Sequence, residues 1–96
     1  MYATVCRHAG VAATSDDRAL AGRALANHLS ALPGFIAYVL LEQLDGACIG
    51  VSIFEDEGSQ VAADRLAEAW LAAHTGAPRA VSPDIITGEV IVQKGL

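Results

Sequence analysis

The sequence has few residues of several kinds, and each shortage excludes a class of protein. Only six of the 96 residues are Lys or Arg, against eleven Asp or Glu, and the formal net charge is -5. Proteins that bind nucleic acid need clustered basic residues to neutralise phosphates, so we expect no nucleic-acid partner. No apolar run approaches the roughly 20 residues that span a bilayer, and no basic segment leads into an apolar one at the start. We therefore expect a cytoplasmic protein without a membrane segment.

Cysteine is also scarce, and its spacing excludes the common metal and redox motifs. Cys6 and Cys48 are the only two cysteines, and neither belongs to a Cys-x-x-Cys pair. Inside apolar segments such thiols behave as small hydrophobic residues, so we expect two buried free thiols and no metal site. The acidic runs Asp16-Asp17 and Glu55-Asp56-Glu57 come where helices are expected to begin, and capping explains them. Gly-rich phosphate loops and a Gly-x-Ser-x-Gly motif are absent, which excludes nucleotide-binding and hydrolase classes and leaves no cofactor to expect.

What the sequence does contain is enough apolar material for one folded domain over residues 1–96. Apolar residues make up 53% of the chain and charged residues 18%, which is unlike a disordered protein. Alternating β-branched runs and helical apolar spacing predict six elements. In order, they are a strand at Tyr2 to Arg7, a helix between Ser15 and Pro33-Gly34, strands at Phe35 to Glu42 and Ala47 to Phe54, a helix from Asp56 to His74, and a strand at Ile85 to Gln93.

This order of elements predicts a ferredoxin-like α+β fold. A strand-helix-strand-strand-helix-strand sequence forms a four-stranded antiparallel sheet with both helices on one face. Asp45-Gly46 predicts the hairpin between the middle strands, while Gly76 and Pro78 predict the end of the second helix. The expected core stripe of the first helix is Ala21, Leu25, His28, Leu29 and Leu32, and that of the second is Ala62, Leu66, Ala69, Trp70 and Ala73. Gly88 is expected at a bulge or a close approach in the last strand.

The sheet has an apolar pattern on both of its faces, although the two helices can cover only one. In the second strand Phe35, Ala37, Val39 and Leu41 alternate with Ile36, Tyr38 and Leu40, and Ile49, Val51 and Ile53 continue the pattern in the third. A soluble monomer rarely exposes several hundred Å² of contiguous apolar surface. We therefore expect a homodimer in which a second copy covers this face, with more than about 1,200 Å² buried in total.

Several short motifs along nearly the whole chain resemble the antibiotic biosynthesis monooxygenase-like superfamily. They are Leu32-Pro33-Gly34-Phe35 before a strand with Tyr38, then Asp45-Gly46, Val51-Ser52-Ile53-Phe54-Glu55-Asp56, Arg65-Leu66-Ala67 with Trp70, and Gly88-Glu89-Val90. The resemblance implies a dimeric α+β barrel, in which two ferredoxin-like sheets close back to back. Turn, core and capping chemistry account for each motif, so the motifs identify architecture better than reaction.

The resemblance also implies a class of chemistry. Family members of this shape include cofactor-independent oxygenases, which deprotonate an aromatic compound so that its anion reacts with dioxygen. Other relatives degrade haem with an Asn on the first strand, a Trp on the second helix and an axial His beyond it. Trp70 is similar to that Trp, but the first strand ends in Cys6-Arg7-His8 without an Asn, and His74 follows Trp70 after one turn. These departures argue against haem degradation.

Four residues are the candidates for a site: His28, Tyr38, Trp70 and His74. His28 on the first helix would act as a desolvated general base. Trp70 and His74 are four residues apart, so they can meet on one helix face and form a pocket wall. Tyr38 can orient a phenolic or quinone oxygen. Each also has a structural explanation, as core filler, helix-end cation or β-strand aromatic.

Two functions from different classes therefore stay open. The first is a small cofactor-independent oxygenase that acts on an aromatic or quinone-like molecule in a pocket between sheet and helices. The second is a non-catalytic dimeric module that carries a ligand or serves as a structural domain. A cavity of roughly 300 Å³ or more, lined by His28 and Trp70, would favour the enzyme or carrier, and a filled interior would favour the structural module. Arg7 and His8 at the end of the first strand are weaker candidates for binding an anionic group.

Overall fold

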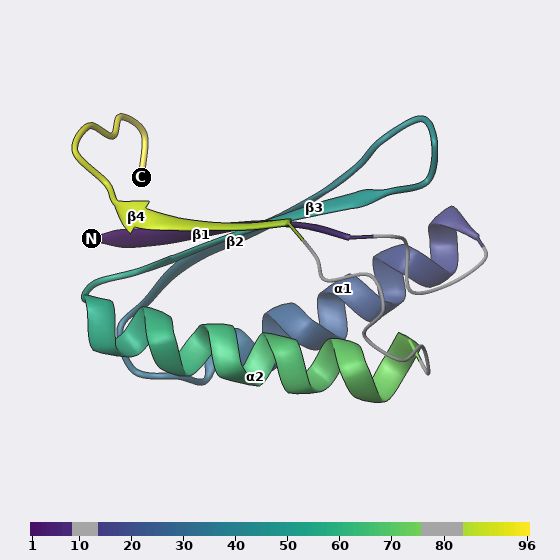
Figure 1. Cartoon of the computed structure of the whole chain (residues 1–96), viewed down its shortest axis with the longest axis horizontal. Helices are drawn as coiled ribbons and strands as arrows, with labels where there is room; N and C mark the ends of the chain where they lie inside the picture. Colours follow the sequence, from purple (N-terminus) through teal and green to yellow (C-terminus); the bar gives the residue numbers. More distant parts are fainter. Residues whose placement is uncertain (9–13, 76–83) are drawn as a thin grey trace.

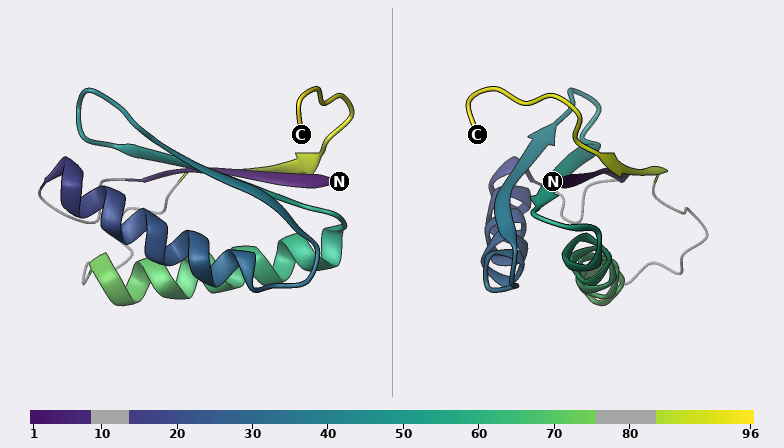
Figure 2. Two further views of the ribbon diagram at one scale, coloured as in Figure 1. Left: turned by 180° about the vertical axis from the view of Figure 1, so that it is seen from behind. Right: turned by 90° about the vertical axis from the view of Figure 1, so that its left-hand side faces the viewer.

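A computed structural model of the chain describes residues 1–8, 14–75 and 84–96 and confirms the ferredoxin-like fold. The elements are β1 (Tyr2–His8), α1 (Ser15–Ser30), β2 (Phe35–Glu42), β3 (Cys48–Phe54), α2 (Glu57–Thr75) and β4 (Asp84–Glu89). The strands form one antiparallel sheet in the order β2-β3-β1-β4. Both helices lie on the same face of this sheet, and no helix of the described residues lies on the opposite face (Figures 1 and 2).

The central strand β3 has the alternation expected of a sheet covered on one face. Cys48, Gly50, Ser52 and Phe54 are buried beneath the helices, and the three residues between them are half-buried. The core cluster consists of Phe54 with Leu25, Leu29 and Ala63. The hairpin predicted at Asp45-Gly46 is confirmed, because Gly46 has a φ of 86° and its N–H donates to the Gln43 carbonyl at 2.9 Å.

Helix α1 begins one residue earlier than its acidic start suggested. Thr14 is the cap, and its Oγ1 accepts the Asp17 N–H at 3.1 Å. Leu25 and Leu29 are buried as expected, but His28 is exposed, so its predicted place in the core stripe is wrong. Each residue advances by about 100° around the helix axis, which places His28 next to Ala21, at the edge of the predicted stripe. The side of α1 that packs on the sheet extends in the opposite direction, through Gly22 and Ala26.

Helix α2 is capped as predicted, but its core stripe is rotated. Asp56 Oδ1 accepts the Ser59 N–H at 2.7 Å. Hydrogen bonding from Ser59 to the carboxylate is the main cause that lowers the pKa of Asp56. The expected stripe residues Ala62, Ala69 and Ala73 are exposed, while Gln60 and Ala63 are buried and Leu66, Ala67, Trp70 and Leu71 are half-buried. Alanines occur on every side of α2, so their spacing does not indicate which side faces the core. The polar residue Gln60 was not predicted to be buried. The predicted helix stop at Gly76 and Pro78 lies outside the described residues.

Strand β2 contains an irregularity that moves Phe35 to the helix side. The β2–β3 register shifts between Phe35 and Ala37, so Phe35 pairs with Phe54 and Ile36 is the extra residue. The two rings meet edge to face, with centroids 5.6 Å apart and planes at 79°. The predicted grouping of Phe35 with Val39 on one face is therefore wrong, because strict alternation does not allow for a bulge.

The last strand is shorter than its sequence pattern. The prediction was Ile85 to Gln93, but β4 ends at Glu89, opposite Tyr2 near the start of β1. One further backbone hydrogen bond follows the ladder, because the Val90 N–H donates to the Met1 carbonyl at 2.9 Å. Gly88 shows no register shift, and no atom lies within 4 Å of where its β-carbon would be, so the expected bulge or close approach is absent within the described part of the chain.

Candidate functional site

A small hollow lies between the helices and the sheet, at the end where β1 finishes and α1 begins. Its volume is about 10 Å³, which is space for about one water molecule. Its lining includes polar and aromatic groups from both layers: His8, Arg18, Gly22, Leu25, Tyr38, Leu40, Cys48, Trp70 and Leu71. The described residues do not enclose the predicted 300 Å³ chamber at this hollow, and His28 is not among its lining residues.

Tyr38 projects from β2 across the floor of this hollow. Its ring lies over Gly50 on the neighbouring strand. A β-carbon on Gly50 would lie only 3.0 Å from the Tyr38 hydroxyl. Burial, with smaller contributions from the thiols Cys6 and Cys48, raises the pKa of Tyr38 to about 12. The phenol is therefore neutral near physiological pH and can donate a hydrogen bond to an anionic oxygen.

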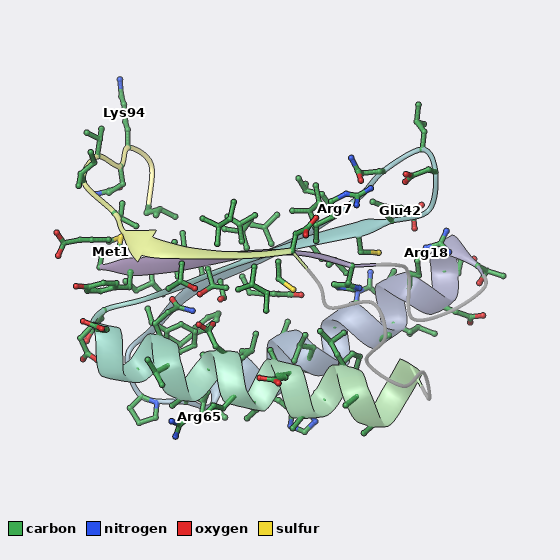
Figure 3. All side chains as sticks on the ribbon, viewed as in Figure 1. Met1, Arg7, Arg18, Glu42, Arg65 and Lys94 are labelled. Carbon is green, nitrogen blue, oxygen red and sulfur yellow. The ribbon has the colours of Figure 1, made fainter. Side chains whose placement is uncertain are left out.

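Arg18, which lines the hollow, forms an ion pair with Glu42 at the end of β2. Arg18 Nε donates to Glu42 Oε2 at 2.5 Å, joining the first turn of α1 to the end of β2. In Figure 3 the two side chains approach each other at this end of the molecule. The Arg18 side chain is only 15% exposed, and the hydrogen bond to Glu42 raises its pKa. The guanidinium is thus a fixed positive charge on the wall of the hollow.

The structure brings only two of the four predicted site residues together. Tyr38 and Trp70 both line the hollow. His28 is exposed on α1, so the desolvation predicted for it is absent. His74 lies within α2, but its side chain is outside the described part of the structure, so its contact with Trp70 stays a prediction.

Three lining residues were missed or undervalued in the sequence. Arg18 precedes Leu25 by seven residues, a spacing that places both on one helix face, and this signal could have revealed it. His8 and Cys48 are directly paired across β1 and β3, which only the register reveals. Burial is the main cause that raises the pKa of the Cys48 thiol, with Arg18 opposing it. Arg7, by contrast, lies on the open side, where Nε donates to Gln43 Oε1 at 3.0 Å (Figure 3).

A second group of polar residues, of which Thr4, Ser52 and Gln60 are buried, lies between α2 and the sheet. Thr4 Oγ1 donates to Asp64 Oδ2 at 3.0 Å and lies 2.9 Å from Thr87 Oγ1. Gln60 Nε2 donates to Asp64 Oδ1 at 2.9 Å and to Ser52 Oγ at 3.0 Å. Gln60 is fully buried, and its Oε1 has no hydrogen-bond partner among the described residues.

Cys6 lies close to this polar group on the helix-facing side of β1. Burial, and next the negative charge of Asp64, raise the pKa of its thiol. A raised thiol pKa disfavours the nucleophilic thiolate. Both cysteines are free, as predicted. Cys48 is buried as expected, but the burial predicted for Cys6 is wrong, because this residue is only half-buried. Among residues 1–8, 14–75 and 84–96, no cluster of three or more His, Cys, Asp or Glu side chains has a geometry that could hold a metal ion.

Comparison of this structure with solved ones gives full-length matches. A candidate antibiotic biosynthesis monooxygenase from Nitrosomonas europaea superposes with a TM-score of 0.74 at 12% identity, covering 98% of this chain and 93% of that one. The chain has the antibiotic biosynthesis monooxygenase-like fold. A substituted form of SnoaB, a cofactor-independent oxygenase from Streptomyces nogalater, matches this fold with a TM-score of 0.66 at 18% identity, covering 96% and 95% of the two chains.

The same fold also occurs in a protein with a metalloporphyrin bound. A substituted form of MhuD with two manganese protoporphyrin IX molecules bound per active site matches with a TM-score of 0.65 at 22% identity, covering 99% of each chain. No protein-family model matches the sequence, and no curated protein matches it. The antibiotic biosynthesis monooxygenase-like fold is therefore established by structure. None of the helices in the described segments combines the length and the apolar character that crossing a membrane requires.

Proposed function

We propose that this protein is a homodimeric, cofactor-independent oxygenase that binds a small aromatic or quinone-like molecule in the hollow beside Trp70. The observation that carries the proposal is the convergence of His8, Arg18, Tyr38 and Trp70 on one hollow from both layers of the fold. An indole wall suits an aromatic ring, while a guanidinium and a neutral phenol suit an anionic oxygen. The cofactor-independent oxygenase among the structural neighbours has this fold and supports the assignment.

The proposed reaction uses a proton acceptor and an anion site. An imidazole can accept a proton near neutral pH, and His8 lines the hollow, so we assign it the role first predicted for His28. Removal of a proton from an anthrone gives an electron-rich anion. Addition of dioxygen and return of the proton give a hydroperoxide, which loses water to leave the quinone. Arg18 and the Tyr38 hydroxyl would stabilise the anion by charge and hydrogen bonding.

A bound aromatic ring requires more space than the hollow offers in this structure. We assign the required movement to Arg18 and Trp70, whose side chains line the hollow from α1 and α2. The proposal therefore includes a ligand-induced opening at the end of the molecule where α1 and the β2–β3 hairpin meet. Binding should be tighter for small, flat rings than for fused systems as large as haem.

The homodimer is part of this proposal. Ile86 is 71% exposed, Val39 and Leu41 are each 52% exposed and Val5 is 37% exposed. The register places all four on the sheet face that carries no helix, beside half-buried Ile49, Val51 and Ile53. A second copy that presents the same face would bury this surface by a two-fold contact.

The small volume of the hollow favours a second candidate function, a non-catalytic dimeric module. A space of about 10 Å³ is nearly filled by the chain's own side chains. In that case the polar lining would serve packing and capping, and no ligand would enter. The two functions differ in one measurable respect, which is whether an aromatic compound changes the environment of Trp70.

The experiment uses Trp70, the single tryptophan of the chain, as its reporter. Anthrone and hydroquinone compounds are titrated while Trp70 fluorescence is followed, and oxygen uptake is measured without added metal or cofactor. A Gly22→Leu variant should lose binding, because a β-carbon there already comes within 2.5 Å of Leu40. Ala24→Leu, on the exposed side of the same helix, is the matched control.

The assignment of the base is tested by two histidine variants. His8→Ala should abolish oxygen uptake while aromatic binding persists, and His28→Ala should retain uptake. Uptake lost in His28→Ala and kept in His8→Ala would return the role to His28. Binding without uptake by any substrate would identify a carrier, and absence of both would favour the structural module.

A further inference from the structure

The group of polar residues between α2 and the sheet contains an acceptor atom that no described residue satisfies. Gln60 is 0% exposed, and its Nε2 donates to Ser52 Oγ at 3.0 Å and to Asp64 Oδ1 at 2.9 Å. The Oε1 of the same amide has no hydrogen-bond partner among the described residues. Buried carbonyl oxygens in proteins nearly always have a partner, so this oxygen points to a ligand that the chain itself does not supply.

Asp64 adds a negative charge at the same place without a basic partner. Its carboxylate accepts hydrogen bonds from Thr4 Oγ1 at 3.0 Å and from Gln60 Nε2. Both ion pairs of the described residues lie elsewhere, and Asp64 takes part in neither. A half-buried carboxylate loses part of its hydration, and a nearby positive charge compensates for that loss.

This group of residues reaches the surface at one edge of the sheet. Thr4 Oγ1 lies 2.9 Å from Thr87 Oγ1. Thr87 is exposed on the edge strand β4, whereas Thr4 and Ser52 are buried on the central strands β1 and β3. Hydrogen-bonded groups therefore extend from solvent at Thr87 to the fully buried Gln60.

We propose that this group of residues is a binding site for a small monovalent cation, Na⁺ or K⁺. Its ligands are the Asp64 carboxylate, Gln60 Oε1 and the hydroxyl oxygens of Thr4 and Ser52, with water completing the coordination. Carboxylate, amide and hydroxyl oxygens are the ligands that hard cations prefer. A hydroxyl oxygen has two lone pairs, so it can coordinate an ion while it takes part in a hydrogen bond.

The charge of the site selects the class of ion. Asp64 is its single carboxylate, and one negative charge balances a monovalent ion, whereas tighter binding of a divalent ion requires more charged ligands. None of the ligand residues lines the hollow beside Trp70. The cation site is therefore separate from the site of the proposed function and does not depend on it.

The test compares thermal unfolding in NaCl, KCl and choline chloride at equal ionic strength. An alkali cation at roughly ten times its dissociation constant should raise the Tm of the wild type by about 5–10 °C above its value in choline chloride. Asp64→Asn should lose this difference between the salts. Asp16→Asn is the matched control, because it removes the same charge from an exposed residue of α1 and should keep the difference.

Side-chain amide signals in NMR spectra of the wild type test the position of the ion, even if Asp64→Asn does not fold. The Gln60 amide signals should shift as alkali chloride replaces choline chloride, and those of the exposed Gln43 should not.

Three results would overturn the proposal. Equal Tm values in all three salts would mean that only ionic strength acts on the protein. An alkali effect that persists in Asp64→Asn would place the ion elsewhere. Gln60 signals that stay unchanged in alkali chloride would mean that water alone satisfies its Oε1.

Discussion

The Tyr38 hydroxyl lies over the backbone of Gly50, at 3.0 Å from the place where a β-carbon on Gly50 would be. This distance is tighter than an ordinary van der Waals contact, so Gly50→Ala must displace the phenol by a few tenths of an ångström. We expect weaker binding of aromatic compounds in Gly50→Ala, measured by Trp70 fluorescence, because Tyr38 would no longer reach the anionic oxygen. Unchanged affinity would show that the hydroxyl does not contact the ligand.

The ionisation of Tyr38 gives a prediction about stability in alkali. Its pKa is raised from 10.0 to about 12 in the folded protein, so the unfolded chain loses the phenolic proton first. Between these values the folded state binds more protons than the unfolded state, and the free energy of unfolding must fall as the pH rises. Urea unfolding across this range should show the fall in the wild type and a smaller one in Tyr38→Phe.

Tyr2 provides the control for that measurement, because it is the only other tyrosine. The negative charge of Glu89 is the largest cause that raises the pKa of Tyr2, although its hydroxyl is at the surface. In Tyr2→Phe, tyrosinate absorbance therefore reports Tyr38 alone and should develop close to pH 12. Absorbance that develops near pH 10 in this variant would contradict the burial of Tyr38.

The sequence predicted the order and type of all six elements because each has a local signal. Asp56, Asp45-Gly46 and the β-branched runs act over a few residues, and the structure bears them out. Positions that depend on contacts between elements were harder to predict from the sequence. His28 satisfies a helical spacing but lies on the flank that the sheet does not cover, and Phe35 changes face because of one extra residue in β2.

The candidate site was only partly predictable for the same reason. Tyr38 and Trp70 were identified as large side chains with polar or aromatic function, and both line the hollow. Arg18 was overlooked because a charged residue near a helix start is usually solvated, whereas its partner Glu42 lies on another element. His8 and Cys48 lie opposite each other because of the register between β1 and β3, and no local sequence pattern defines that register.

The buried polar group beneath α2 predicts a difference between two threonines. Thr4 is buried, and Thr4→Val would remove the hydrogen bond from Thr4 to Asp64 and leave the one from Gln60, so we expect the free energy of unfolding to fall by about 1–3 kcal/mol. Thr87→Val keeps the bond between Thr4 and Asp64 and alters an exposed residue, so it should cost less than about 0.5 kcal/mol. Urea denaturation of both variants measures the difference, and equal losses would contradict the burial of this group.

The Arg18–Glu42 pair gives the sharpest prediction for the proposed ligand. Arg18→Gln removes the positive charge from the wall of the hollow, so affinity for an anionic aromatic compound should fall by about tenfold, while affinity for its neutral analogue should change little. Arg23→Gln is the matched control, because Arg23 lies on the same helix and is exposed. Added salt should weaken binding of the anion in the wild type and in Arg23→Gln, but much less in Arg18→Gln. Equal losses in the two arginine variants would mean that only the general field of the protein attracts the anion, and Arg18 would then be a structural link between α1 and β2.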